Sequence, residues 1–217
     1  MQKQIAVNNS CYNWILRTPS NILYVIQTCS SFVLAGGKSS RFGVNKSLSL
    51  VGSQPMALVV ANNLQTAFGS AALLVGADAE TCNKIGLDSL TGPREGNGPL
   101  AAMIDAMESS ANTLVAFAPN DTPFFSSDNF SALLAKIEQS GSDAVVVVDD
   151  LDSPRTHWLL SIWRIERCLI TLRNEYDRGV RSIHGAVTGL QIATIMCGAA
   201  SVRNINTVSD MPDQGTI

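Results

Sequence analysis

Glycines and basic side chains gather in one short stretch, FVLAGGKSSRFGVNKSL, which spans residues 32–48. Gly36 and Gly37 end an apolar run, and because glycine has no Cβ, the backbone there can approach a ligand closely. Successive backbone N–H groups in such a turn can converge on an anion. Arg41 and Lys46 add positive charge: an arginine can bind two phosphate oxygens at once, whereas a lysine acts as a compact point charge. The pattern indicates a loop that wraps a polyphosphate.

This stretch matches neither the P-loop pattern nor the dinucleotide-binding fingerprint. An ordinary strand-to-helix turn with solvated charges therefore remains the alternative interpretation of the loop taken alone. A second polar cluster, PNDTP at residues 119–123, also follows an apolar run. Magnesium is usually held by one or two carboxylates, with water and substrate phosphates as its other ligands. Asp121 is thus the candidate metal ligand, and a simple turn aspartate is the alternative.

Apolar runs alternate with amphipathic stretches along most of the chain. Strands are expected within residues 30–37, 71–78, 113–121 and 143–150, and helices at 56–68, 98–107 and about 127–139, the last starting at Ser127 or Asp128 and ending at Gly141. Residues 157–187 indicate a strand, a helix and a basic loop. This alternation predicts an α/β fold of three layers, a mainly parallel sheet with helices on both faces. Ligands of such sheets bind beyond the carboxyl ends of the strands, where both polar clusters lie.

The domain organisation follows from length and composition. A chain of 217 residues with 46% apolar content is long enough for one full core. We expect a single domain from residue 29 to residue 217. Residues 1–28 fit neither the strand period nor the helix period, so they are predicted to be an N-terminal extension, either a disordered tail or the product of an upstream start codon.

Charge and cysteine content exclude several classes of partner. The net charge is −3 and the pI about 5.3, so no basic field is available to hold a nucleic acid. No apolar run has the length of a membrane span, and the N-terminal residues do not resemble a signal peptide. The five cysteines are widely spaced and include no C-x-x-C pair, which indicates buried or incidental thiols. A cytoplasmic protein is expected.

Four motifs together resemble one known family. LAGGKSSRFGVNK is similar to the signature L-A-G-G-x-x-x-R-[MF]-G-x-D-K of molybdenum cofactor guanylyltransferases, members of the glycosyltransferase-like nucleotidyltransferases. GNGPLAAM, PNDTPF and NINTVSDM resemble the later blocks of that family and occur in the same order, between Ser31 and Met211. The resemblance implies a Rossmann-like nucleotidyltransferase fold. It also implies an enzyme that moves GMP from GTP to molybdopterin, releases pyrophosphate and uses Mg²⁺ as its cofactor.

The resemblance also assigns residues to roles. It implies a nucleotide site formed by Leu34, Ala35, Gly36, Gly37, Arg41, Lys46, Gly98, Pro99 and Leu100, with Arg41, Lys46 and Asp121 as catalytic residues, Asp121 as metal ligand, and Arg181, Ser182, Asn204 and Asn206 on the acceptor side. Gly36 favours GTP, because cytidine-transferring relatives tend to read L-A-A-G in its place. For the two asparagines, a role as turn formers is an equally good explanation. Transient contacts with cofactor-synthesis or acceptor enzymes are also compatible with the family.

Three features depart from the family pattern or leave a choice open. Asn45 stands where the signature has Asp, which removes a charge although the amide can still accept a hydrogen bond. A second metal-binding carboxylate could be either Asp88 or Glu95. His157 and His184 have no partner at metal-ligand spacing, so both are expected to be surface or packed histidines.

Two alternative functions therefore stay open beside the guanylyltransferase. One is a related nucleotidyltransferase with a different phosphorylated acceptor, because all such enzymes handle the same triphosphate. The other is a degenerate member that binds a nucleotide or a partner protein without catalysis. The retained Arg41, Lys46 and Asp121 favour an active enzyme.

Overall fold

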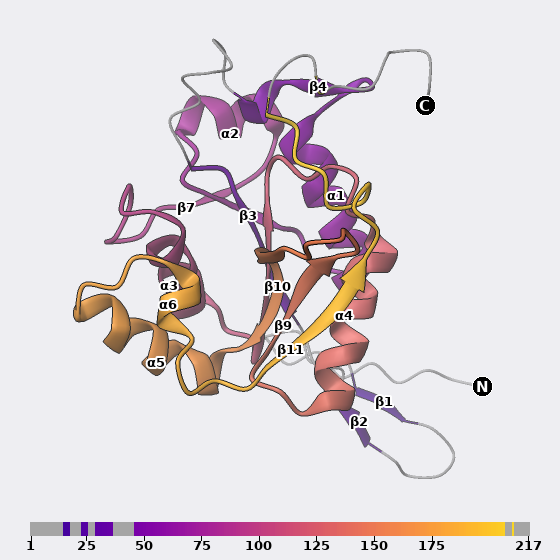
Figure 1. Ribbon diagram of the computed structural model, residues 1–217. Helices are drawn as coiled ribbons and strands as arrows, with labels where there is room; N and C mark the ends of the chain where they lie inside the picture. The colour runs from indigo at the N-terminus through magenta and orange to yellow at the C-terminus, as the bar shows by residue number, and fades with distance from the viewer. Residues whose placement is uncertain (1–14, 18–22, 26–28, 37–45, 207–209, 211–217) are drawn as a thin grey trace.

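A seven-stranded, mainly parallel sheet runs through the computed structural model, which describes residues 15–17, 23–25, 29–36, 46–206 and 210 (Figure 1). Its strands are β3 (Cys29–Leu34), β6 (Leu73–Val75), β7 (Ser89–Leu90), β8 (Leu114–Pro119), β9 (Ala144–Asp149), β10 (Thr156–Arg164) and β11 (Ile192–Cys197). Their order is β11-β9-β10-β8-β3-β6-β7. Only β10, among these described strands, runs antiparallel to its neighbours. The mainly parallel α/β sheet predicted from the sequence is confirmed.

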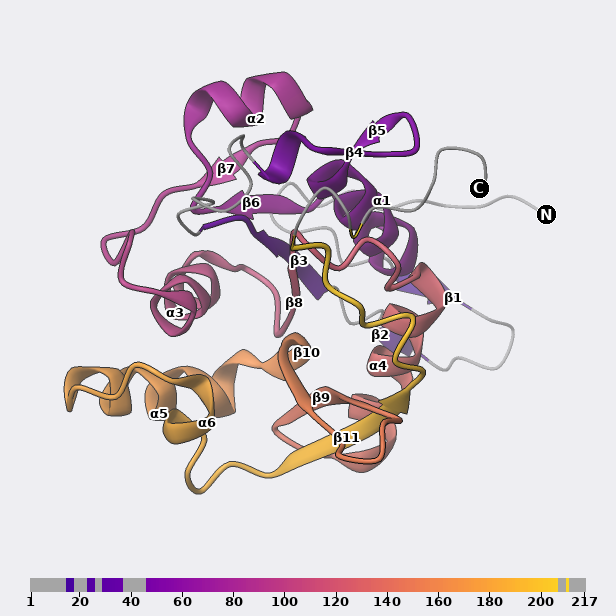
Figure 2. The same cartoon turned by 45° about the horizontal axis from the view of Figure 1, so that its top comes forward.

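Helices cover both faces of this sheet (Figure 2). They are α1 (Met56–Phe68), α2 (Ala79–Ile85), α3 (Pro99–Ser109), α4 (Ser127–Ser140), α5 (Ile165–Asp177) and α6 (Ile183–Ala186). One apolar core lies between the sheet and α1, α2 and α4, and the other lies between the sheet and α3, α5 and α6. Alternate residues of each central strand enter opposite cores: Ala116 contributes to the first, whereas Val115 and Phe117 contribute to the second. This alternation explains why the central strands read as continuous apolar runs.

Several short elements carry no recognisable pattern in the sequence. Within residues 1–28, β1 (Ile15–Arg17) pairs with β2 (Leu23–Val25), although the sequence there fits neither period. Strands β4 (Leu50–Val51) and β5 (Gln54–Pro55) form another antiparallel pair. Elements of two or three residues are too short for a period of two to be visible, which is the physical reason they were missed. That residues 1–28 form an extension separate from the domain stays a prediction.

The predicted boundaries of α4 need one correction. The helix begins at Ser127, and its N-cap is Ser126 instead of Ser127 or Asp128. The Ser126 hydroxyl accepts the Asn129 N–H at 3.4 Å. At the other end Gly141 takes a left-handed conformation with φ of 63°, as predicted from its position. None of the helices in the described part of the chain is long and apolar enough to cross a membrane.

The cysteines in the described residues are buried and free, as the sequence indicated. They are Cys29, Cys82, Cys168 and Cys197, and Cys11 lies outside the described residues. Burial raises the pKa of the Cys168 thiol to about 12, and it also raises the pKa of the Cys29 thiol. The thiols of Cys29 and Cys168 are therefore protonated and unreactive near neutral pH.

Phe117 lies at the centre of the sheet, where it is fully buried and its ring stacks on Phe32 with 5.9 Å between ring centroids. We expect Phe117→Ala to lower the free energy of unfolding by about 3–5 kcal/mol, through lost transfer energy and the cavity left behind. Urea denaturation measures this change. Met196→Ala is the matched control, since Met196 is 72% exposed on the edge strand β11 and its loss should change stability by less than about 0.5 kcal/mol. Equal effects of the two substitutions would contradict this assignment of the core.

Candidate active site

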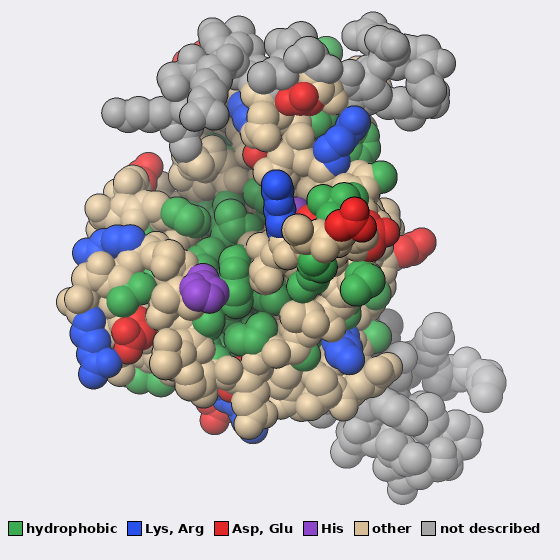
Figure 3. All heavy atoms as spheres, in the orientation of Figure 1, with side chains coloured by type: hydrophobic (Ala, Val, Ile, Leu, Met, Phe, Trp, Pro, Cys, Tyr) green, Lys and Arg blue, Asp and Glu red, His purple; other side chains and the backbone are tan. Residues whose placement is uncertain are grey.

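A cavity of about 550 Å³ opens at the edge of the sheet where the carboxyl ends of β3, β6 and β8 meet. Its lining comes from these strand ends (Leu34, Gly36, Val75, Gly76), the segment before and at the start of α3 (Leu90, Gly92, Arg94, Glu95, Gly96, Gly98, Pro99, Ala102, Asp105), the turn after β8 (Pro119, Asn120, Asp121, Thr122), β10 (His157, Trp158, Leu159, Leu160) and Asn204. In the space-filling view this face is hollowed, with hydrophobic side chains in the hollow (Figure 3). Parallel α/β sheets bind ligands in this position.

An ion pair lies at this edge of the sheet. Lys46 Nζ is 2.7 Å from Asp121 Oδ2, and each side chain is only about one-sixth exposed, at 15% and 16%. Lys46 Nζ also donates to Asn206 Oδ1 at 3.0 Å. The second carboxylate oxygen, Asp121 Oδ1, is buried and has no hydrogen-bond partner within the described part of the chain. A buried carboxylate oxygen without a donor is costly unless a further ligand satisfies it.

The turn after β8 holds the two charged residues in place. Asn120 N–H donates to the carbonyl of Leu34 at 3.0 Å, which fixes the turn to the end of β3. The Asn120 side chain donates through Nδ2 to Ser47 Oγ at 2.8 Å, and Ser47 follows Lys46 in a short 3₁₀ helix, Lys46–Leu48. The carbonyl of Asp121 accepts the backbone N–H of Ile205 at 2.9 Å. Two backbone hydrogen bonds and one side-chain hydrogen bond thus set the positions from which Lys46, Asp121 and Asn206 converge.

Two glycines bring the ends of β3 and β6 close together. A Cβ at Gly76 would lie 2.9 Å from the Cα of Gly36, closer than side-chain carbons pack in proteins. Gly76 also has a φ of 82°, a conformation that favours glycine. Beside them, the Ala35 N–H donates to the carbonyl of Val75 at 2.9 Å. The first part of the predicted glycine loop therefore forms one wall of the cavity.

Comparison with known proteins decides the family. The model of the MobA-like NTP transferase domain matches residues 31–190, which is most of the chain. The chain belongs to this family. It is accordingly a nucleotidyltransferase, as the resemblance of its four motifs implied.

Individual relatives agree with this membership. The molybdenum cofactor guanylyltransferase of Cupriavidus necator is 27% identical over 186 residues, which cover 84% of this chain and 94% of that protein. The enzyme of the same name from Haemophilus influenzae is 26% identical over 141 residues, or 64% of this chain and 72% of that protein. Among solved structures, the molybdopterin-guanine dinucleotide biosynthesis protein A of Archaeoglobus fulgidus has a TM-score of 0.65 at 19% identity, covering 83% of this chain and 94% of that one.

The same architecture occurs in other nucleotidyltransferases. The CMP:2-keto-3-deoxy-manno-octonic acid synthetase, solved with CTP, has a TM-score of 0.69 at 13% identity and covers 84% of this chain and 95% of that chain. At such low identity the likeness shows the fold alone. The Rossmann-like nucleotidyltransferase fold expected from the sequence is confirmed.

The predicted nucleotide-site residues of this MobA-like transferase occupy different positions. Leu34, Gly36, Gly98 and Pro99 line the cavity, and Ala35 lies beside it. Leu100 is fully buried in the core beneath α3 and is not among the lining residues. Gly37, Arg41 and Asn45 lie outside the described residues, so their roles stay predictions.

On the acceptor side, the structure separates the predicted residues into two pairs. Asn204 lines the cavity and Asn206 contacts Lys46. Arg181 and Ser182 make local contacts and are not among the lining residues. Arg181 donates to the carbonyls of Tyr176 and Val180 and lies over the Tyr176 ring, while the Ser182 hydroxyl caps α6 by accepting the Gly185 N–H.

The residues at the cavity suit a magnesium ion bound together with a substrate. Within the described residues no group of three or more His, Cys, Asp or Glu side chains is placed to hold a metal by itself. Magnesium does not need such a cage, because one or two carboxylates with water and phosphate oxygens complete its octahedron. Asp121 Oδ1, buried and without a partner in the described residues, is the donor that fits. Of the two candidates for a second carboxylate, Glu95 lines the cavity and Asp88 is not among the lining residues.

His157, which the sequence predicted to be a surface or packed histidine, lines the cavity. Its Nε2 lies 3.1 Å from Oδ2 of Asp149, whose side chain is only 3% exposed, while Asp149 Oδ1 accepts the Arg155 N–H at 2.9 Å. Trp158 follows His157 in the lining and packs edge-on against His184. The pairing of His157 with Asp149 joins β10 to the end of β9, and no spacing rule in the sequence signals it.

These contacts make acid stability depend on Asp149. The hydrogen bond from the Arg155 N–H is the main reason that the pKa of Asp149 lies below its ordinary value of 3.8, and the hydrogen bond with the His157 side chain lowers it further. A carboxyl whose pKa is lower in the folded state stabilises the fold above its unfolded pKa, and this contribution is lost as pH falls through the folded pKa. We expect Asp149→Asn to be less stable than the parent at pH 7, and the difference to shrink below about pH 4. Urea denaturation from pH 7 to pH 3, with the exposed loop variant Asp152→Asn as control, measures this, and a difference that does not change with pH would contradict it.

Proposed function

We propose that this nucleotidyltransferase moves GMP from Mg²⁺-bound GTP to molybdopterin and releases pyrophosphate. The observation that carries the proposal is the Lys46–Asp121 pair at the carboxyl ends of the strands, with one carboxylate oxygen left for a further ligand. The choice of acceptor and of guanine rests on the relatives, which are named molybdenum cofactor guanylyltransferases. The LAGG sequence at residues 34–37 supports the same choice.

In this reaction an oxygen of the acceptor phosphate attacks the α-phosphorus of GTP. The new P–O bond forms as the bond from the α-phosphorus to the bridging oxygen breaks, and pyrophosphate leaves with that oxygen. The protein's contribution to such a transfer is positioning and neutralisation of charge. Lys46 supplies an ammonium group at the cavity edge, held by Asp121 and Asn206, and we expect Arg41 to add a second cation.

Asp121 would hold the metal through Oδ1, with Glu95 as the candidate for a second carboxylate. A bound Mg²⁺ supplies neutralisation of the phosphate charge that develops during transfer. Lys46 keeps the other oxygen, Oδ2, and so fixes the orientation in which Asp121 presents Oδ1. The acceptor would enter from the side of the cavity formed by His157, Trp158 and Asn204.

Nucleotide titration by calorimetry tests the proposal. GTP, ATP, CTP and UTP are each titrated with Mg²⁺ into the parent, Lys46→Ala and Asp121→Asn. We expect the parent to select GTP, and Lys46→Ala to bind it at least about tenfold more weakly, because a charged partner of the phosphates is lost. Chelation of Mg²⁺ should weaken GTP binding to the parent but leave Asp121→Asn almost unchanged.

Lys84→Ala is the matched control, because Lys84 forms an exposed ion pair with Glu80 on α2, outside the cavity lining. It should bind GTP as the parent does. Equal affinity of the parent for all four nucleotides would contradict guanine selection. Lys46→Ala and Asp121→Asn variants that bind GTP like the parent would contradict the assigned site and favour a degenerate, non-catalytic member.

A further inference from the structure

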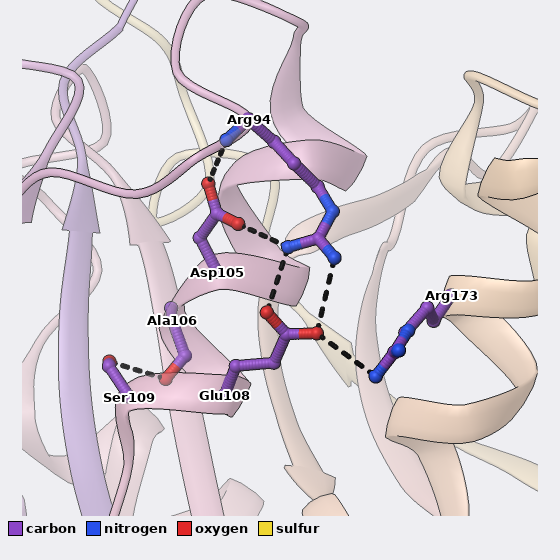
Figure 4. Close-up of polar contacts among 6 residues, drawn as sticks. All are labelled: Arg94, Asp105, Ala106, Glu108, Ser109 and Arg173. Carbon is purple, nitrogen blue, oxygen red and sulfur yellow. Dashed lines mark hydrogen bonds and ion pairs between the residues drawn. The ribbon is translucent and has the colours of Figure 1, made fainter.

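A four-residue ionic cluster holds the segment of residues 91–98, between β7 and α3, against α3 (Figure 4). The Arg94 side chain contacts two carboxylates of α3, Asp105 and Glu108. Its Nη1 donates to Asp105 Oδ1 and to Glu108 Oε2, and its Nη2 donates to Glu108 Oε1 at 3.2 Å. Arg173 of α5 reaches Glu108 from the outside at 3.5 Å. This segment supplies much of one wall of the cavity.

Asp105 anchors the segment most firmly. Its side chain is only 3% exposed, and it accepts two bonds from the same residue, one from the Arg94 side chain and one from the Arg94 backbone N–H at 3.0 Å. A buried carboxylate held by charged donors in this way is geometrically well determined. Gly92 packs directly on that carboxylate, and a Cβ at position 92 would overlap it. The backbone of the segment is therefore fixed at both Gly92 and Arg94.

Arg94 lines the cavity, yet the charge of its guanidinium is already compensated. The guanidinium contacts Asp105 and Glu108 together. Glu108 also contacts the half-exposed Arg173, at the longer distance of 3.5 Å. Two carboxylates and two guanidinium groups leave no net positive charge in the cluster. Arg94 is thus poorly suited to bind a triphosphate.

The rest of the segment offers uncharged backbone groups and one acidic side chain. Gly96 and Gly98 line the cavity with positive φ values of 79° and 91°, and Glu95 lies between Arg94 and Gly96. Backbone N–H and C=O groups of such glycines can meet the polar edge of an uncharged ligand closely. The base and ribose are the parts of a nucleotide that this wall can accept.

We propose that Arg94 and Asp105 are positioning residues, which hold residues 92–98 in the shape that receives the base and ribose and so set the base selectivity of the enzyme. This inference rests on the proposed function and goes beyond it by naming the interaction that maintains selectivity. Neither residue acts on the reacting phosphates. Weakening the ion cluster should therefore affect recognition of the base and leave recognition of the triphosphate intact.

The experiment compares three probes on three variants by calorimetry. Arg94→Lys keeps the positive charge but loses the bidentate contact with the carboxylates. Gly92→Ala displaces the Asp105 carboxylate without removing any charge. Arg178→Ala is the control, because it removes a different Arg–Glu pair, the exposed one with Glu175. The probes are GTP, ATP and inorganic tripolyphosphate, each with Mg²⁺. We expect Arg94→Lys and Gly92→Ala to weaken GTP about tenfold and to bring the affinities for GTP and ATP together. Tripolyphosphate affinity should stay within about twofold of the parent in every variant, and Arg178→Ala should match the parent throughout.

Each other outcome has a definite meaning. If tripolyphosphate binding falls as much as GTP binding, Arg94 binds phosphate and the inference is wrong. If Arg94→Lys and Gly92→Ala keep the parent's GTP preference, the inference is wrong while the proposed function stands. If the parent itself shows no GTP preference, the proposed function fails. Circular dichroism and thermal unfolding of each variant establish that the fold is kept, and Arg94→Ala is avoided because it would leave Asp105 buried without its partner.

Discussion

The Lys46 ammonium and the Asp121 carboxylate meet at the carboxyl ends of parallel strands, 2.7 Å apart and mostly shielded from water. The pair satisfies only half of the carboxylate, since Asp121 Oδ1 is buried without a partner in the described residues. Such an arrangement is expensive for a stable fold and useful for a site that receives a cation with its anionic ligand. The positions of the surrounding elements can be understood from the need to hold these two groups together.

Most of that support comes from the backbone. The β8 turn is bonded to the end of β3 through Asn120, and the segment that carries Asn204 and Asn206 returns from far along the chain to the Asp121 carbonyl. A parallel sheet allows this convergence because its strands end at one edge while their sequences lie far apart. The ion cluster of Arg94 plays the corresponding part at residues 91–98, where it holds a segment whose glycines line the cavity. We therefore expect the phosphates to bind beside Lys46 and Asp121, and the base to bind beside residues 92–98.

The strongest sequence signals came from continuous apolar runs and from glycines. The runs around Val33, Phe117 and Val146 predicted the central strands correctly, because residues buried on both faces of a sheet must all be apolar. The same signals could not show that β10 runs antiparallel, since strand direction depends on how the chain crosses the sheet. Short elements such as β7, with two residues, carry no period at all.

The site was predictable only in part, because residues that meet in it lie far apart in the sequence. Local motifs indicated Lys46 and Asp121 separately, but they are 75 positions apart in the sequence, and only the fold shows that they touch. Arg94 and Asp105 belong to no motif considered in the sequence, and their pairing arises from a loop that folds back on its own helix. His157 was interpreted as a surface or packed histidine because its partner, Asp149, stands on the neighbouring strand.

The transfer reaction itself tests the role of the Lys46–Asp121 pair most directly. Pyrophosphate release is measured with Mg²⁺, GTP labelled at its α-phosphate, and molybdopterin, while the labelled product is separated and counted. We expect the parent to release one pyrophosphate for each GMP joined to molybdopterin, and Asp121→Asn to lose this turnover by at least about a hundredfold. If the parent binds GTP but transfers no label to molybdopterin, the guanylyltransferase assignment is contradicted. If Asp121→Asn turns over like the parent, the central role of the Lys46–Asp121 pair is contradicted.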